Sequence, residues 1–248
     1  MFHLGVDGMT TRVLLLAGGL GTRLRPLTDR LPKPLIPIAG RPLLDYWLDR
    51  FRAAGLEEIR INNHHLPELI REYIEEVNRG GEFRITEAYE PELLGSAGTV
   101  TANRDLADGA SAVVIVYADN LSDVDLGALI DYHRGHGDAL TMMLFRTDYP
   151  EKCGIASMDA EGRVLRFEEK PKQPESDLAN AGVYVATPGA YREMADIGGF
   201  DIGFDVLPRF VGRMRGWVWN GYHRDIGTMV SLEAARDEVR DGFGAGSA

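Results

Sequence analysis

Three glycines and two cations lie close together near the start of the chain. Gly18, Gly19 and Gly21 follow an apolar run that is typical of a strand, and Arg23 and Lys33 come after them. Glycine lets backbone N–H groups approach an anion because no Cβ blocks the way, and neighbouring N–H groups form a concave anion site. An arginine fork with a lysine nearby suits a polyphosphate better than a single anion. The spacing predicts a nucleoside triphosphate site.

Two familiar phosphate motifs do not describe this loop. A P-loop needs Gly-Lys-Ser or Gly-Lys-Thr after its last glycine, whereas this chain has Gly21-Thr22-Arg23. The dinucleotide motif GxGxxG would place its third glycine at Leu24.

The whole stretch GGLGTRLRPLT, followed by KP, resembles the sugar-phosphate nucleotidyltransferases, also called NDP-sugar pyrophosphorylases. The resemblance runs over residues 12–240, nearly the full chain. It implies that Arg23 and Lys33 are catalytic cations. The loop residues expected to bind the nucleotide are Leu16, Ala17, Gly18, Gly19, Gly21 and Thr22.

Two aspartates are candidate metal ligands. Asp119 follows the apolar run 112–117, and ligands of open α/β sheets collect beyond the carboxyl ends of the strands. Magnesium takes one or two carboxylates together with substrate phosphates. Asp225 lies in YHRDIGT, which resembles the family's W-x-D-I-G-T and differs at His223-Arg224; Ala118 stands where the family has glycine. The resemblance implies that Asp119 and Asp225 hold Mg²⁺, although Asp225 could instead cap a helix that begins near Met229.

Three short patterns resemble the family's sugar-phosphate site. In Glu168-Glu169-Lys170-Pro171, the family's lysine grips the sugar phosphate and its glutamate binds sugar hydroxyls; without the resemblance this is an ordinary charged turn. Asn180-Ala181-Gly182 resembles the family's N-A-G, and Cys153-Gly154 resembles its Y-G with cysteine in place of tyrosine. The expected sugar-binding residues are Gly154, Glu169, Asn180 and Gly182, with Lys170 among the catalytic ones.

The segment 90–99 is the candidate base-reading element, because a glycine turn that opens a helix exposes main-chain groups to a base edge. Its expected nucleotide-binding residues are Glu90, Gly95, Gly98 and Thr99. The form L-G-x-A-G resembles guanylyltransferases for mannose or heptose phosphates, which favours GTP. Thymidylyl, uridylyl and cytidylyl relatives remain alternatives.

Strand and helix patterns alternate along the first part of the chain. Apolar residues recur at helical spacing over 44–51, 66–77, 98–106 and 126–133. Strand-like runs fall at 13–16, 59–62, 83–88, 112–117 and 139–145, and shorter ones at 154–158, 164–168, 182–186 and 217–219. This order predicts an α/β fold with a doubly wound, mostly parallel, Rossmann-like sheet and a smaller β-rich lobe that binds the sugar.

The expected organisation is a single nucleotidyltransferase domain over 12–242. Its nucleotide half would cover about 12–145 and its sugar half about 146–242. Residues 1–11 are expected to form a flexible extension and 243–248 a flexible tail.

Composition narrows the possible partners. Hydrophobic residues make up 44% of the 248, enough for a sizeable core, and the net charge of −11 disfavours nucleic acid. No apolar stretch is long enough to cross a membrane, and the first residues do not resemble a signal peptide. Cys153 is the single cysteine, as expected in the reducing cytoplasm. Relatives are often homo-oligomers, so a homo-oligomer is possible.

The favoured function is condensation of a nucleoside triphosphate with a sugar 1-phosphate, by Mg²⁺-assisted in-line attack on the α-phosphorus. An alternative from another class is a non-catalytic subunit that senses nucleotide sugars; a third is a cytidylyl- or molybdopterin-type transferase with a non-sugar acceptor. His133 and His136 have a spacing that could suit zinc, but no further ligand completes the set, which favours a packing role.

Overall fold

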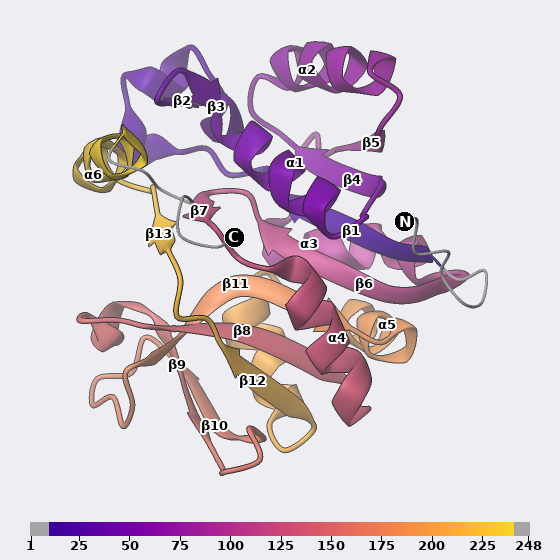
Figure 1. Ribbon diagram of the computed structural model, residues 1–248, viewed down its shortest axis with the longest axis vertical. Helices are drawn as coiled ribbons and strands as arrows, with labels where there is room; N and C mark the ends of the chain where they lie inside the picture. Colours follow the sequence, from indigo (N-terminus) through magenta and orange to yellow (C-terminus); the bar gives the residue numbers. More distant parts are fainter. Residues whose placement is uncertain (1–9, 241–248) are drawn as a thin grey trace.

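The computed structural model describes residues 10–240, and its centre is a nine-stranded sheet (Figure 1). Its first block is parallel, in the order β5-β4-β1-β6, and β11 then runs antiparallel to both β6 and β8. Strand β12 lies parallel to β8, and the β9–β10 hairpin joins β11. The strands are β1 Thr10–Leu16, β4 Glu58–Asn63, β5 Arg84–Tyr89, β6 Ala110–Tyr117, β8 Leu140–Arg146, β9 Gly154–Met158, β10 Val164–Glu169, β11 Leu178–Ala186 and β12 Met214–Val218.

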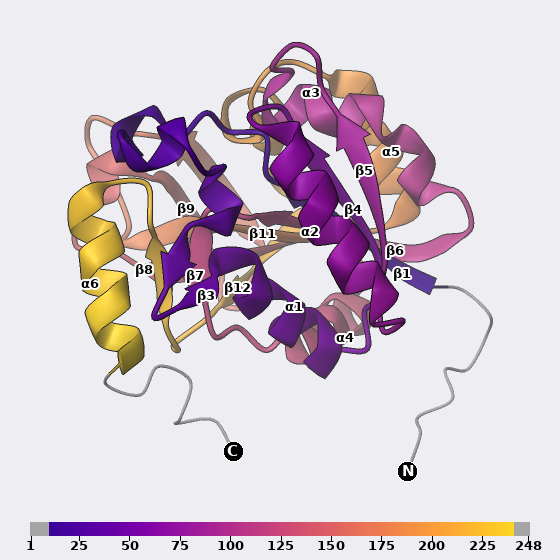
Figure 2. The same ribbon diagram turned by 90° about the horizontal axis from the view of Figure 1, so that it is seen from above.

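Helices cover both faces of the sheet. Figure 2 shows α1 and α4 on one side and α3 and α5 on the other. The helices are α1 Leu43–Ala53, α2 Pro67–Arg79, α3 Gly95–Ala102, α4 Leu126–His136, α5 Pro188–Ile197 and α6 Met229–Arg240. Single helical turns lie at Thr22–Leu24, Leu27–Asp29, Lys33–Leu35, Arg104–Ala107, Pro150–Lys152, Ile202–Val206 and Leu207–Phe210.

The alternating directions of the side chains along β1 explain why helices cover both faces of the sheet. Val13 and Leu15 belong to the core under α1, α2 and α4, whereas Leu14 and Leu16 belong to the core under α3 and α5. Successive strand residues point to opposite faces, so an uninterrupted apolar run needs a helical layer on each side. A third cluster, which includes Leu24, packs α6 against the segment that follows the glycine loop.

Two small ladders supplement the sheet. Strand β7 (Asn120–Ser122) pairs antiparallel with β13 (His223–Asp225), and β2 (Pro37–Ile38) pairs with β3 (Arg41–Pro42). The β7–β13 ladder brings the last strand of the described chain next to β7, which follows β6, as Figure 1 shows.

The predicted α/β fold with its largely parallel sheet is confirmed. The helix expected over 98–106 ends earlier, since α3 covers Gly95–Ala102 and a separate turn follows. Helix α5 and strands β7 and β13 were not predicted. The two strands have only three residues each, too few to show a period, whereas α5 has apolar residues at helical spacing that were overlooked. Of the expected extension 1–11, Thr10 and Thr11 belong to β1, and residues 1–9 and the tail 243–248 lie outside the described residues.

Candidate active site

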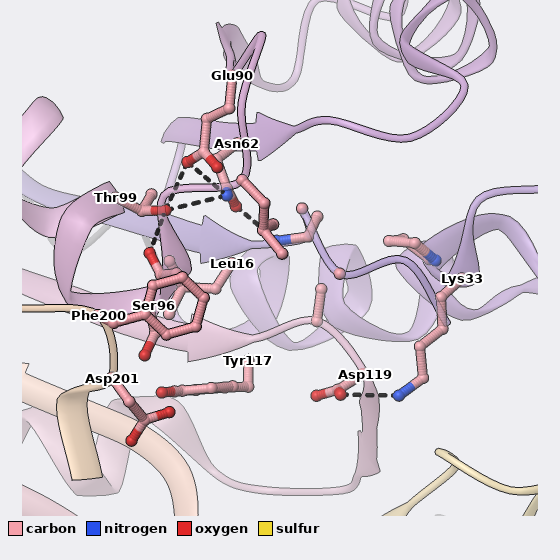
Figure 3. A pocket seen from close by; sticks show the side chains of 17 residues that line it. Leu16, Lys33, Asn62, Glu90, Ser96, Thr99, Tyr117, Asp119, Phe200 and Asp201 are labelled. Carbon is pink, nitrogen blue, oxygen red and sulfur yellow. Dashed lines mark hydrogen bonds and ion pairs between the residues drawn. The ribbon is translucent and has the colours of Figure 1, made fainter. Parts of the chain in front are cut away.

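A cavity opens at the carboxyl ends of β1, β4 and β6, where the parallel strands finish together (Figure 3). We call it the nucleotide cavity. Of the expected nucleotide-binding residues it is lined by Leu16, Ala17, Gly18, Gly19, Glu90, Gly95 and Thr99. Lys33 and Asp119 line it as well.

The glycine loop is held in place by Asn62, at the carboxyl end of the neighbouring strand β4. The N–H of Ala17 donates to Asn62 Oδ1 at 2.6 Å. A Cβ on Gly18 would lie 2.7 Å from Asn62 Nδ2, so only glycine lets the loop pass this close to the amide. Gly21 has a φ of +60°, and its carbonyl accepts from the Thr28 hydroxyl at 2.9 Å. The loop is thus shaped by its neighbours before any ligand binds.

Glu90 is buried and fully engaged with the protein. Its Oε1 accepts from Asn62 Nδ2 at 2.9 Å and from the Thr99 hydroxyl at 2.5 Å, and its Oε2 accepts from the Leu94 N–H at 3.3 Å. Figure 3 shows this cluster at one end of the nucleotide cavity. Glu90 therefore orders the wall of the cavity through Asn62 and Thr99.

Lys33 and Asp119 face each other at the opposite end of this cavity. Lys33 Nζ lies 2.7 Å from Asp119 Oδ2. The lysine comes from the turn after the glycine loop, and the aspartate follows β6. The carboxylate therefore reaches the cavity with its position set by a buried ammonium group.

A second cavity adjoins the first, and we call it the acceptor cavity. The two share Tyr117, Asp119 and Asp201. All the residues expected to bind the sugar line it, together with three of the expected catalytic ones: Gly154, Glu169, Asn180, Gly182, Lys170, Asp119 and Asp225. Asp119 thus stands at the boundary of the two cavities.

Glu169 occupies space that two glycines leave open. A Cβ on Gly154 would collide with Glu169 Oε2, and one on Gly203 would lie 2.6 Å from the same atom. Burial is the main reason that the pKa of Glu169 is raised, with Asp201 adding to the rise and Lys170 opposing it. A carboxyl group in this position can accept hydrogen bonds from hydroxyl groups of a ligand.

Lys170 has an unusual backbone, with a φ of +53°. Its N–H donates to the Cys153 carbonyl at 2.9 Å, which fixes this conformation. Its side chain is largely exposed, and Nζ lies 5.7 Å from the centroid of the Phe204 ring. Left-handed backbone at a non-glycine residue is costly and concentrates at functional sites.

Asn180 and Gly182 form a tight bend in β11. The Asn180 amide donates to the Tyr184 hydroxyl at 2.7 Å, and its Oδ1 accepts from the Gly182 N–H at 3.0 Å. Gly182 has a φ of +70° and packs against the Tyr117 ring, which a Cβ would approach to 3.0 Å. The bend therefore presents β11 to the floor of the acceptor cavity.

Asp225 reaches the site through the β7–β13 ladder. It pairs with Asn120, and the N–H of Ile226 donates to the Asp119 carbonyl at 3.1 Å. Gly227 lies between Asp225 and Arg23, since a Cβ there would be 2.6 Å from Asp225 Oδ1 and 2.8 Å from an Arg23 nitrogen. The N–H of Gly227 also donates to the Asp225 carboxylate.

Four expected site residues lie outside the lining of both cavities. Thr22 and Arg23 form an exposed turn beside Gly227, and Gly21 packs against Thr28. Gly98 lies on α3 where it packs against the Leu94 side chain. The structure therefore does not bring these four into the cavities, and the roles predicted for all the site residues stay predictions.

Sequence reasoning missed several lining residues: Asn62, Ser96, Tyr117, Phe200, Asp201 and His223. Asn62 could have been found from its place at the end of a strand parallel to β1. Tyr117 ends the apolar run that leads to Asp119, and we interpreted it only as a strand residue. Phe200 and Asp201 lie in a loop with no recognisable motif.

His133 and His136 both contact the hydroxyl of one threonine. His133 Nδ1 and His136 Nε2 each lie 2.8 Å from the Thr141 hydroxyl, which fits the expected packing role. Burial raises the pKa of the Cys153 thiol, which disfavours a nucleophilic thiolate. The helices of residues 10–240 are each too short or too polar to cross a bilayer.

Comparison with known proteins adds to this geometry. Residues 12–242 match the family model described as nucleotidyl transferase. The chain is 35% identical over 180 residues to mannose-1-phosphate guanylyltransferase 1 of Arabidopsis thaliana, covering 71% of this chain and 50% of the relative. It is 31% identical over 242 residues to the glucose-1-phosphate adenylyltransferase of Thermosipho africanus, covering 88% and 59%. The chain thus spans about half to three fifths of the length of these relatives.

A solved structure shares the fold. It is a putative glucose-1-phosphate thymidylyltransferase from Bacillus anthracis in complex with a sucrose, which superposes with a TM-score of 0.80 at 23% identity and covers 94% of this chain and 96% of its own. The family match spans nearly all the described residues, including both cavities. The chain belongs to the nucleotidyl transferase family.

Proposed function

We propose that this protein condenses a nucleoside triphosphate with a sugar 1-phosphate, giving an NDP-sugar and pyrophosphate. The observation that carries the proposal is the pair of adjoining cavities that share Asp119, one next to a glycine loop and one lined by Lys170 and Glu169. Two anionic substrates would be brought together at this boundary. The names of the relatives make GTP with mannose 1-phosphate the first pair to test, and ATP with glucose 1-phosphate the second.

Each half of the chain supplies most of the lining of one cavity. The half up to about residue 145 supplies most of the nucleotide cavity, and the half from about 146 to 242 supplies most of the acceptor cavity. Each half also reaches into the other cavity, since Phe200 lines the first and Tyr117 lines both.

The proposed step is an in-line displacement. An oxygen of the sugar 1-phosphate forms a bond to the α-phosphorus, and the bond between the α-phosphorus and the bridging oxygen breaks as pyrophosphate leaves with the electron pair. Lys170 would hold the attacking phosphate, while Lys33, Arg23 and the N–H groups of the glycine loop would stabilise negative charge on the triphosphate. Positioning and charge neutralisation, without a covalent enzyme intermediate, are what such a transfer requires.

Asp119 and Asp225 are suited to a magnesium ion. Both line the acceptor cavity; Asp119 directly precedes β7, and Asp225 ends β13, the strand that pairs with β7. Among residues 10–240 no group of three or more His, Cys, Asp and Glu side chains gathers as a metal site. Two carboxylates fit Mg²⁺, which completes its coordination with water and substrate phosphates. When bound, the ion would neutralise phosphate charge.

The test is pyrophosphate release. The protein would be incubated with Mg²⁺, one of GTP, ATP, dTTP, UTP or CTP, and one sugar 1-phosphate from a panel of hexoses, aminohexoses and heptoses. Pyrophosphate that appears only when both substrates are present supports the proposal, and a chelator in excess of Mg²⁺ should abolish it. Tight nucleotide binding with no turnover for any pair would favour a regulatory subunit that senses nucleotides.

A further inference from the structure

One loop of the second half of the chain places an exposed aromatic ring in the nucleotide cavity. We call residues 198–205 the aromatic loop. The carboxylate of Asp205 accepts hydrogen bonds from the N–H of Phe200 at 2.7 Å and from that of Asp201 at 2.9 Å. Gly199, with a φ of +99°, packs directly against the Asp205 side chain. The loop is therefore internally fixed.

The same loop is fastened to the start of α3. The carbonyl of Phe200 accepts from the Ala97 N–H at 3.2 Å, and the Ile202 N–H donates to the Ser96 hydroxyl at 2.9 Å. The ring lies over Gly95, where a Cβ would come within 2.8 Å of two ring carbons. A side chain at position 95 would displace the ring, so the glycine makes room for it.

Phe200 is 60% exposed although it lines a cavity. Figure 3 shows it beside Leu16, Ser96 and Tyr117, at the end of the cavity away from Lys33 and Asp119. A fixed aromatic face that is open to solvent inside a cavity offers apolar area to a flat ligand group, and every nucleobase has such a π-face.

Charge orients a nucleotide in this cavity. Lys33 is the one cationic side chain among the described lining residues. Glu90, at the Phe200 end, already accepts hydrogen bonds from three protein groups. The triphosphate therefore belongs near Lys33 and the glycine loop, which leaves the base for the end that carries Phe200.

We propose that Phe200 stacks on the nucleobase and that this contact favours purines, whose two fused rings cover more of the phenyl face than a pyrimidine does. The inference rests on the proposed function, since it specifies how that site holds its nucleotide. It assigns Phe200 as a specificity-determining residue.

The experiment measures binding by titration calorimetry with Mg²⁺ and no sugar phosphate. The ligands are GTP, UTP and inorganic tripolyphosphate, which has the charge but no base. The variants are Phe200→Ala, Phe200→Leu and Phe200→Tyr, and the control is Leu165→Ala, an equally exposed apolar side chain on β10 that lines neither cavity.

Phe200→Ala is expected to weaken GTP roughly 10- to 100-fold and UTP less, from the usual value of a base–aromatic stack. Tripolyphosphate should bind Phe200→Ala as it binds the wild type. Phe200→Tyr should retain GTP binding, whereas Phe200→Leu should not, and Leu165→Ala should match the wild type for all three ligands. Thermal unfolding of each variant confirms that it is folded, which is expected because the hydrogen bonds that hold the loop do not involve the Phe200 side chain.

Three results would overturn the inference: unchanged GTP affinity in a folded Phe200→Ala, an equal loss for tripolyphosphate, or equal losses for GTP and UTP. These outcomes are distinct from failure of the proposed function, which is read from pyrophosphate release by the wild type. A wild type that turns over while Phe200→Ala binds GTP normally would end the stacking proposal alone. A wild type that binds GTP through Phe200 without turnover would end the enzymatic proposal alone.

Discussion

Lys33 and Asp119 form an ion pair whose two members differ in exposure: the lysine side chain is 8% exposed and the aspartate side chain 37%. The ammonium group lies inside the protein, and the carboxylate faces the place where the two cavities meet. A buried charge needs its partner to offset lost hydration. The pair therefore holds the carboxylate in place and leaves part of it open to the two cavities.

Asp119→Asn should leave a folded protein with little activity. The amide keeps the size of the side chain but loses the charge that would hold Mg²⁺, and removing one such preorganised group commonly costs ~10²–10³ in kcat. The measurement is kcat from pyrophosphate release at saturating Mg²⁺. Asp131→Asn, on the exposed side of α4, serves as the matched control and should keep wild-type kcat. Normal turnover by Asp119→Asn would show that this carboxylate is not required.

Asn62→Ala should raise the KM for the nucleotide roughly tenfold and lower the free energy of unfolding by about 1.5–3 kcal/mol. The substitution removes the acceptor for the Ala17 N–H and a donor to the buried Glu90 carboxylate. Asn63→Ala is the control, because Asn63 is equally buried but points to Glu87 and lines neither cavity. Equal nucleotide KM values in the two variants would contradict a role for Asn62 in shaping the glycine loop.

Gly154→Ala should impair use of the sugar 1-phosphate and spare the nucleotide. The new methyl group would meet the Glu169 carboxylate and approach the Phe167 ring to 2.7 Å. Misplacing a positioning group by about 1 Å commonly costs on the order of 10²-fold in rate. We therefore expect kcat/KM for the sugar phosphate to fall roughly 10- to 100-fold. Gly135→Ala, on α4 with nothing near its added Cβ, should leave kinetics unchanged. An unchanged kcat/KM in Gly154→Ala would argue against Glu169 at the acceptor.

Stability should fall as the pH drops from about 6.5 to about 4. Burial lowers the pKa of His133 to about 4 from its ordinary 6.5, so in this window the unfolded chain binds a proton that the folded protein does not. The loss from this residue is at most roughly 3 kcal/mol. His136 and His223 also have lowered pKa values and act in the same direction. Denaturant unfolding at pH 4.5 to 7 should show a shallower pH slope in His133→Gln; an unchanged slope would contradict this assignment.

Much of the fold could be predicted from the pattern of apolar residues in the sequence. The run Ala112–Tyr117 and the strand before Gly18 are apolar on successive residues, which requires a buried parallel sheet with helices on both faces. The reversal of β11 could not be predicted, because it depends on which neighbours a strand pairs with and leaves no trace in its composition. Helix α5 carries Ala190, Tyr191, Met194 and Ala195 at helical spacing, and it was missed because it follows directly on β11.

The candidate site was predictable where glycine or charge stands in a fixed pattern. Residues such as Gly18, Lys33 and Lys170 were predicted in this way and line the cavities, whereas Arg23, predicted from the same pattern, lines neither. Asn62 and Phe200 were not found, because their roles come from neighbours far away in the chain. Asn62 matters through a hydrogen bond to Ala17, and Phe200 through the hydrogen bonds of its loop to α3.

The ladder between β7 and β13 has a consequence for how the protein comes into being. Asp119 is synthesised early, directly after β6, when the four parallel strands β1, β4, β5 and β6 can already associate. Asp225 is added more than a hundred residues later. A nascent chain that ends before β13 could therefore fold around its glycine loop and still lack one of the two carboxylates. If both carboxylates are needed, catalytic activity would appear only late in synthesis, when the three residue pairs between β13 and β7 form.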